Sequence, residues 1–166
     1  MAFGKLGRYV TPHSWIGGGC TLAAALAVCI RVGSPLPVLH RLGAGDLIPP
    51  LWLMGTLWLL GMFAVGWAFG CLLGMQTGGP VRDALKYRGS TCLVIAMVFA
   101  LLWYELLFCS LSLLFSWLCL AVAIGTAVLC ALSWWRLCRP VACITVAFSL
   151  WRLWLFLLQL GIMLRT

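Results

Sequence analysis

Charged side chains are scarce in this chain of 166 residues: they make up 8% of it, and only three residues are Asp or Glu. Hydrophobic residues make up 64%, and the mean hydropathy is +1.12. A soluble domain of this size needs a polar and charged exterior, which this composition does not supply. The shortage of charge therefore excludes an ordinary water-soluble fold and indicates a chain whose main solvent is lipid.

Paired cysteine motifs are also missing. The chain has nine cysteines but no Cys-x-x-Cys, and most of the nine lie inside apolar stretches. Thiol–disulfide oxidoreductases of membranes need such a pair. We therefore interpret the cysteines as small apolar packing residues and expect no metal site.

Long apolar runs fill most of the chain, and each is close to the roughly 20 residues that a membrane-crossing helix needs. The runs cover residues 14–32, 51–74, 91–110, 111–135 and 141–164. Backbone groups in hydrocarbon must be paired within their own segment, so each run predicts a helix, whereas a barrel would show alternating segments of about 10 residues. We predict an all-α membrane protein in which residues 1–166 form one compact bundle of five transmembrane helices.

The first run has a second interpretation, as a signal peptide, because Lys5 and Arg8 precede it and small alanines lie near its end. We favour a membrane helix, because the apolar run continues past those alanines to Arg31.

The basic residues are distributed unevenly between the two sides of the predicted bundle. Net charge is +8, and seven Lys and Arg precede the first run or fall in the second and fourth loops. The other side has three: Arg31, Arg41 and Arg165. The positive-inside rule then predicts a cytoplasmic amino terminus and an external carboxyl terminus. Anionic lipid headgroups are the expected partner of the basic loops, and nucleic acid is not.

Small residues at intervals of four mark the second run, where Gly66, Gly70 and Gly74 form a double small-x-x-x-small stripe. Such stripes let helix backbones approach closely in lipid. The stripe is either a packing seam within the bundle or the seam of a homodimer, and the sequence leaves both open.

Tryptophan is abundant, with ten residues. Four lie near the ends of runs, where an indole suits the headgroup level: Trp15, Trp52, Trp134 and Trp135. Five lie deeper: Trp58, Trp67, Trp103, Trp151 and Trp154. Deep indoles either line a cavity for a planar apolar ligand or fill the bundle core.

Two charges, Glu105 and Arg152, lie well inside the predicted spans. Such charges usually face the interior and are paired or line a cavity. Counted along their helices, their depths differ by only about 3 Å. We therefore predict a Glu105–Arg152 ion pair, serving either as structural glue or as a ligand anchor.

Three short motifs resemble a known family. The run from Pro49 to Trp58, Pro-Pro-Leu-Trp-Leu-Met-Gly-Thr-Leu-Trp, resembles the second-helix signature of the TspO/MBR family of tryptophan-rich sensory proteins. This family includes the mitochondrial translocator protein, or peripheral benzodiazepine receptor. The segment 103–108 and the segment 147–151, followed by Leu158-Gln159, are similar to its third- and fifth-helix motifs. The resemblance covers the layout of the whole chain.

The resemblance implies a five-helix receptor or transporter, usually dimeric, with a pocket open toward the first loop. Family ligands are porphyrins such as protoporphyrin IX and haem, sterols, and benzodiazepine-like compounds, so a tetrapyrrole would be a ligand rather than a required cofactor. Carried over by motif position, the lining residues are Trp58, Trp67, Trp103, Leu155, Leu158 and Gln159, with Trp151 on the same wall. The divergence from the family pattern suggests a bacterial cytoplasmic membrane as the location.

Some positions depart from that pattern. Leu155 replaces a small alanine, which narrows the implied pocket, and neither Glu105 nor Arg152 stands where the family has a charge. The carboxyl-terminal segment 160–165 has no tyrosine, which disfavours the usual sterol motif.

Two other function classes stay open. One is a small polytopic assembly factor or exporter subunit that uses the Gly66–Gly70–Gly74 stripe as its partner interface. The other is a porphyrin-degrading enzyme with photochemistry at a pocket tryptophan. No catalytic residue is assigned, because the sequence offers no nucleophile–base pair and no metal-binding set.

Overall fold

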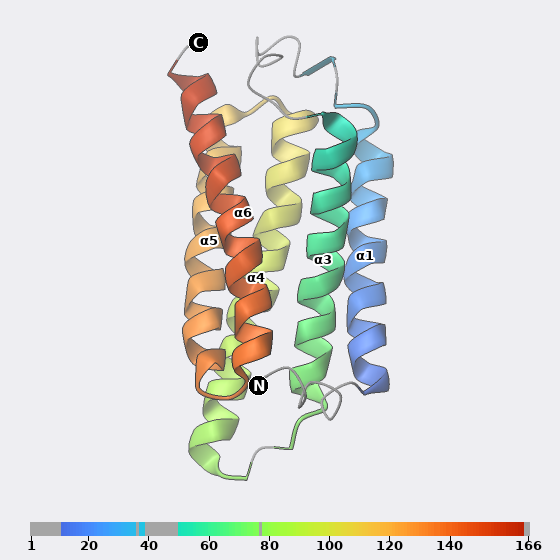
Figure 1. The fold of residues 1–166 in the computed structure, drawn as a ribbon. Helices are drawn as coiled ribbons and strands as arrows, with labels where there is room; N and C mark the ends of the chain where they lie inside the picture. The colour runs from blue at the N-terminus through green and yellow to red at the C-terminus, as the bar shows by residue number, and fades with distance from the viewer. Residues whose placement is uncertain (1–10, 36, 39–49, 77, 165–166) are drawn as a thin grey trace.

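Five long helices make up the computed structural model, which describes residues 11–35, 37–38, 50–76 and 78–164 of the chain (Figure 1). They are α1 (Pro12–Val32), α3 (Leu51–Leu73), α4 (Pro80–Phe108), α5 (Leu113–Trp135) and α6 (Arg139–Met163). Each of the five is long and apolar enough to cross a membrane. The predicted all-α bundle is confirmed, and the chain is an integral membrane protein.

Proline marks the beginning of three of these helices. Pro12, Pro80 and Pro140 occupy the first or second helical position of α1, α4 and α6. A proline is tolerated there because the first backbone N–H groups of a helix have no intrahelical acceptor. At the start of α1, the N–H of Thr11 also donates to Ser14 Oγ at 3.0 Å.

The start of α4 differs from the prediction. The helix begins at Pro80 rather than at residue 91, so Arg82, Lys86 and Arg88 lie in its first turns and not in a loop. Charged residues interrupt an apolar run but can still be helical. Hydropathy alone therefore placed the beginning of α4 too far along the chain. Lys86 Nζ donates to the carbonyl oxygens of Leu73 and Met75, at 3.0 and 2.8 Å, and so closes the end of α3.

The helices form a closed ring in the order α1, α3, α6, α5 and α4. Contacts between α1 and α4 close this ring, and α3 also touches α4 across its middle. Neighbours in sequence run in opposite directions (Figure 1). We call the end where α1 finishes and α3 begins the pocket end. We call the opposite end, where α4 and α6 begin, the basic end.

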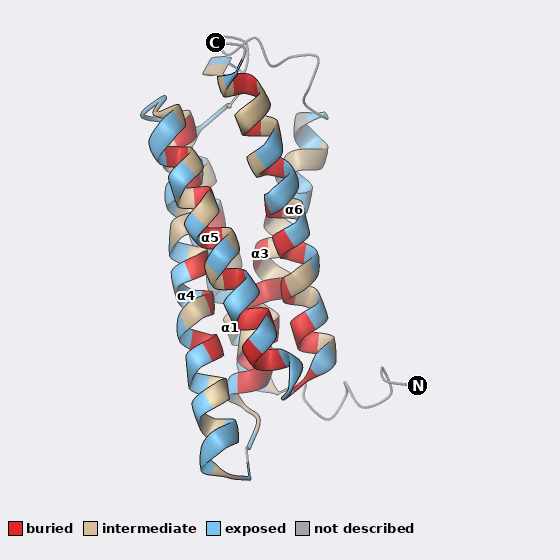
Figure 2. Ribbon diagram, turned by 90° about the vertical axis from the view of Figure 1, so that its left-hand side faces the viewer, coloured by how far each residue is buried: buried red, intermediate tan, exposed pale blue. Residues whose placement is uncertain are grey.

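Buried residues follow the inward faces of the helices, and exposed ones face outward (Figure 2). Many exposed residues are large and apolar, such as Ile30, Leu132 and Leu150. An outer surface of this kind suits contact with lipid tails. Trp134 lies near the end of α5, as expected, but it is fully buried and its indole packs on Gly89 of α4.

The glycine stripe of α3 is filled by α1. A Cβ added at Gly66 would overlap the side chain of Thr21, and one added at Gly70 would overlap the backbone of His13 and Ser14. Across this seam Thr21 Oγ1 donates to the Met62 carbonyl at 2.9 Å. Of the two interpretations that the sequence left open, these contacts favour a packing seam within the chain.

Candidate functional site

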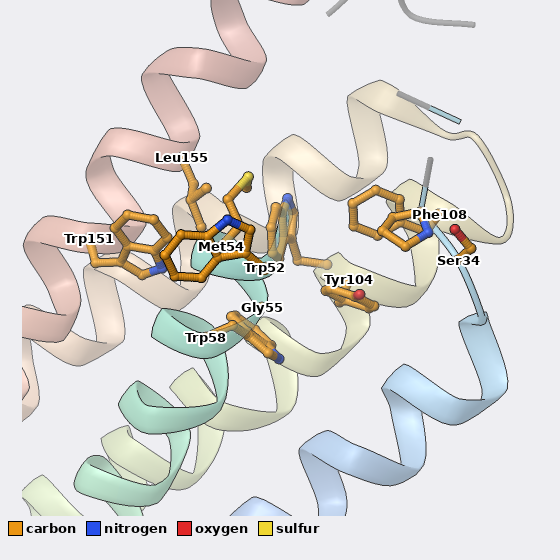
Figure 3. Close-up of a pocket in the computed structure, with 11 residues that line it drawn as sticks. Ser34, Trp52, Met54, Gly55, Trp58, Tyr104, Phe108, Trp151 and Leu155 are labelled. Carbon is orange, nitrogen blue, oxygen red and sulfur yellow. The ribbon is translucent and has the colours of Figure 1, made fainter. Parts of the chain in front are cut away.

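An aromatic pocket of about 360 Å³ lies at the pocket end of the bundle (Figure 3). Three helices and the start of the first loop contribute to it. Its lining consists of Ser34, Pro35, Trp52, Met54, Gly55, Trp58, Trp103, Tyr104, Phe108, Trp151 and Leu155. The wall is almost entirely apolar, and the volume falls in the lower part of the range usual for small-molecule sites.

Helical spacing brings these side chains to one place. In the first turns of α3, Trp52, Gly55 and Trp58 recur every three residues and so share a face. The same rule places Tyr104 with Phe108 on α4, and Trp151 with Leu155 on α6, at intervals of four. Gly55 leaves open space, since a Cβ added there would meet nothing within 4 Å.

Trp58 is the centre of the aromatic wall and is 4% exposed. Its ring stacks on Tyr104 with centroids 5.7 Å apart and an interplanar angle of 23°. It also meets Trp103 at 5.6 Å in a tilted arrangement, and Tyr104 meets Phe108 at 4.7 Å. Offset and tilted pairs of this kind hold ring positions beyond what area burial alone does.

Gln159 holds the aromatic wall in place by hydrogen bonds. Its Oε1 accepts from Trp103 Nε1 at 2.8 Å, and its Nε2 donates to the Leu113 carbonyl at 2.9 Å and to Ser116 Oγ at 2.6 Å. The side chain is therefore engaged on both sides and fixes the Trp103 indole. It joins α6 to α4 and α5 rather than facing the pocket.

The structure brings together four of the residues expected to line the ligand site: Trp58, Trp103, Trp151 and Leu155. Trp67, Leu158 and Gln159 were expected there as well, but they do not line this pocket. Trp67 lies about two and a half turns beyond Trp58 along α3, toward the basic end.

Sequence reasoning missed several members of the site. Trp52 was assigned to the membrane interface, and Tyr104 and Phe108 were quoted only as part of a motif, yet all three line the pocket. For Trp52 the available signal is its spacing from Trp58, through Gly55, at intervals of three. Phe108 shares a face with Tyr104 at an interval of four, but the position of Tyr104 next to Trp103 gave no such signal. Interval alone identifies a shared face once one member of it is known to face the cavity.

The predicted Glu105–Arg152 ion pair is wrong. Glu105 Oε1 pairs instead with Arg31 Nη2, at 2.9 Å, and this is the ion pair found among the described residues. The bond joins the end of α1 to the end of α4, next to Tyr104 of the pocket wall. The predicted depths were counted with α4 beginning at residue 91. In the structure Glu105 lies about one turn from the end of α4, whereas Arg152 lies about three turns from the end of α6, so the two charges are at different depths.

Arg152 lies inside the bundle at 1% exposure. Its guanidinium carbon is 4.3 Å from the centroid of the Phe148 ring, a cation–π contact. Its Nε and Nη2 have no hydrogen-bond partner among the described residues. A desolvated cation–π contact contributes about 2 kcal/mol, whereas burying an unpaired ion costs several kcal/mol. The charge of Arg152 is thus incompletely compensated.

Two indole N–H groups of the pocket wall also lack a hydrogen-bond partner. Nε1 of Trp58 and Nε1 of Trp151 are buried without an acceptor among the described residues. Buried donors are ordinarily paired, and each orphan is unfavourable by about 1–3 kcal/mol. The wall of the site therefore contains two buried hydrogen-bond donors without acceptors among the described residues.

The described residues contain no group of three His, Cys, Asp or Glu side chains that could hold a metal ion. The site can therefore be characterised as an aromatic cavity with two unpaired N–H donors buried in its wall. No known protein family, no curated protein and no solved structure matches the chain.

Proposed function

We propose that this chain is a TspO-like membrane receptor or transporter that binds a planar hydrophobic ligand, a tetrapyrrole of the porphyrin or haem type, in the aromatic pocket. The observation that carries the proposal is the convergence of Trp58, Trp103 and Trp151 from three helices on one cavity. Flat, polarisable walls favour a flat, polarisable ligand. Benzodiazepine-like compounds share that shape and are secondary candidates.

The position of the three motifs supports the family assignment within this proposal. The run from Pro49 to Trp58 supplies the α3 wall, the segment 103–108 supplies the α4 wall, and Trp151 of the third motif supplies part of the α6 wall. Motifs far apart in the sequence thus meet at one cavity. A shared ligand site is a physical reason for such motifs to occur together.

The proposal includes a cytoplasmic amino terminus in a bacterial cytoplasmic membrane. Among the described residues, Arg82, Lys86, Arg88, Arg136 and Arg139 lie at the basic end, and Arg31 lies near the pocket end. The positive-inside rule then directs the pocket toward the external side. A homodimer remains part of the proposal, through a face other than the filled glycine stripe.

The assembly-subunit alternative has less support. It relied on the glycines of α3 as a partner surface, and α1 occupies that surface. Porphyrin degradation is tested by the experiment below, because the absorption of the pigment is followed along with its binding.

The test is a titration of the detergent-purified protein with protoporphyrin IX, following tryptophan fluorescence and pigment absorption together. We expect saturable quenching that weakens in Trp58→Phe and Trp151→Phe, because these indoles line the cavity. Trp15→Phe is the matched control, since Trp15 is exposed on α1 outside the pocket. Quenching that does not saturate, or that changes equally in all three variants, would refute the proposal. An absorption band that decays under light would indicate degradation.

A further inference from the structure

Unpaired hydrogen-bond donors are buried in and behind the wall of the aromatic pocket. Trp58 Nε1 and Trp151 Nε1 belong to the pocket wall, and both are unpaired among the described residues. Arg152 adds two unpaired N–H groups, at Nε and Nη2. Donors that share a site and have no acceptor call for a ligand atom that accepts hydrogen bonds.

Arg152 lies next to the pocket along the chain and in space. Its neighbour Trp151 and the residue one turn further on, Leu155, both line the cavity. The guanidinium is folded back over Phe148, whose ring is 6.3 Å from that of Trp58, centroid to centroid. The charge is therefore one aromatic ring behind the pocket wall, and the flexible arginine stem allows it to turn toward the cavity.

The charge is the strongest reason to expect an acidic ligand. The described residues offer Arg152 no carboxylate, since Glu105 is paired with Arg31. An arginine in the interior of a membrane bundle is normally paired or faces a ligand or ion path. A carboxylate matches the planar guanidinium fork and accepts two hydrogen bonds from it.

We propose that Arg152, together with the indole N–H groups of Trp58 and Trp151, forms a seat for a carboxylate of the pocket ligand. The ligand class is thus an amphipathic planar acid, with its ring system against the aromatic wall and its acidic arm directed inward. This inference rests on the proposed function and adds to it the charge of the ligand.

The experiment compares two probes that share a ring system, protoporphyrin IX and its dimethyl ester, which has no free carboxylate. The wild-type protein binds the acid roughly 10- to 100-fold more tightly than the ester, because a hydrogen bond to a charged group is lost in the ester. In Arg152→Met the affinity for the acid falls to that for the ester, while ester binding is unchanged. Arg152→Lys retains part of the preference, because it retains the charge but not the fork.

Arg139→Met is the matched control, since Arg139 is an exposed arginine of the same helix at the basic end. It keeps the full preference for the acid. Equal affinity of the wild type for acid and ester, or a preference that survives in Arg152→Met, would overturn the carboxylate seat while leaving ring binding intact. If neither probe saturates, the proposed function fails and the seat fails with it.

Thermal unfolding of the ligand-free protein provides a second readout, which also detects a misfolded variant. Arg152→Met removes an incompletely compensated buried charge, so its unfolding temperature rises by a few degrees relative to the wild type. A lower unfolding temperature would show that the bundle already stabilises the guanidinium, and it would overturn the proposal.

Discussion

Gln159 illustrates how a single polar residue is held within a membrane-spanning helix. Its amide makes three hydrogen bonds, to the Trp103 indole, the Leu113 carbonyl and the Ser116 hydroxyl. Each partner comes from another helix or its cap, so one side chain ties α6 to α4 and α5. The residue that the sequence assigned to ligand contact therefore acts on the pocket indirectly, through the orientation of Trp103.

Replacing Gln159 by leucine tests this role. The change leaves the N–H of Trp103 without its acceptor, whereas Ser116 Oγ still donates to the Leu113 carbonyl, so we expect the free energy of unfolding to fall by about 1–3 kcal/mol. Thermal unfolding in detergent, read by circular dichroism, measures this as a lower unfolding temperature. Gln76→Leu, at an exposed position between α3 and α4, is the control and has little effect. An unchanged unfolding temperature in Gln159→Leu would show that the network contributes nothing to stability.

Residue-level prediction succeeded for tryptophans carried over by motif position and failed where it depended on the exact boundary of a helix. Trp58 and Trp103 were expected at the cavity, and they line it. Glu105 and Arg152 were paired by depth alone, but Glu105 contacts Arg31 of α1 and Arg152 folds over Phe148. The depth count assumed that α4 begins at residue 91, whereas the helix begins at Pro80, so the predicted depths of the two charges did not match the structure.

At the scale of helices, the contact between α1 and α3 depends on glycine. The stripe of Gly66, Gly70 and Gly74 lets the backbone of α1 lie directly on α3, and Gly17 of α1 contributes to the same approach. In lipid there is no hydrophobic drive between helices, so close backbone packing must hold them together. The interval of four predicted a seam, but it did not reveal which helix would fill it.

Gly70→Ala tests the seam against Gly125→Ala, a matched change on α5. An added Cβ at Gly70 overlaps the backbone of α1, whereas one at Gly125 meets nothing within 4 Å. Alanine favours a helix by about 1 kcal/mol over glycine at both positions, but overpacking costs about 1–3 kcal/mol at Gly70. We therefore expect Gly70→Ala to lower the unfolding temperature and Gly125→Ala to maintain or raise it.

The same pair of variants distinguishes the two interpretations of the stripe. If Gly70→Ala were as stable as Gly125→Ala and instead dissociated an oligomer in size-exclusion chromatography with light scattering, the stripe would face a second copy. Loss of stability without a change in mass supports packing within the chain.

For the whole molecule, the five helices decide the placement of its ends. An odd number of alternating helices puts the start of α1 and the end of α6 on opposite sides of the membrane (Figure 1). Hydropathy was sufficient to predict this, because the existence of long apolar segments is the most robust property of a membrane sequence. Hydropathy was not sufficient to predict the pocket, since the pocket forms where three motifs from different helices meet.

The proposed orientation is based on the charges of the basic end and has a direct test in a bacterial host. The described basic residues at that end are Arg82, Lys86, Arg88, Arg136 and Arg139. Because such residues are retained in the cytoplasm, the carboxyl terminus should be external. Alkaline phosphatase fused after Thr166 is then active, and a green fluorescent protein fused at the same place is dark.

Fusions after Leu137 are the internal control, because they remove α6 and return the junction to the basic end. At this junction the reporter results reverse: the phosphatase is inactive and the fluorescent protein is fluorescent. If instead the fluorescent protein is bright after Thr166, the amino terminus is external and the pocket opens to the cytoplasm. Activity of both reporters at one junction would show insertion in both orientations. The expected pattern places the aromatic pocket on the external side, so a tetrapyrrole would enter it from outside the cell.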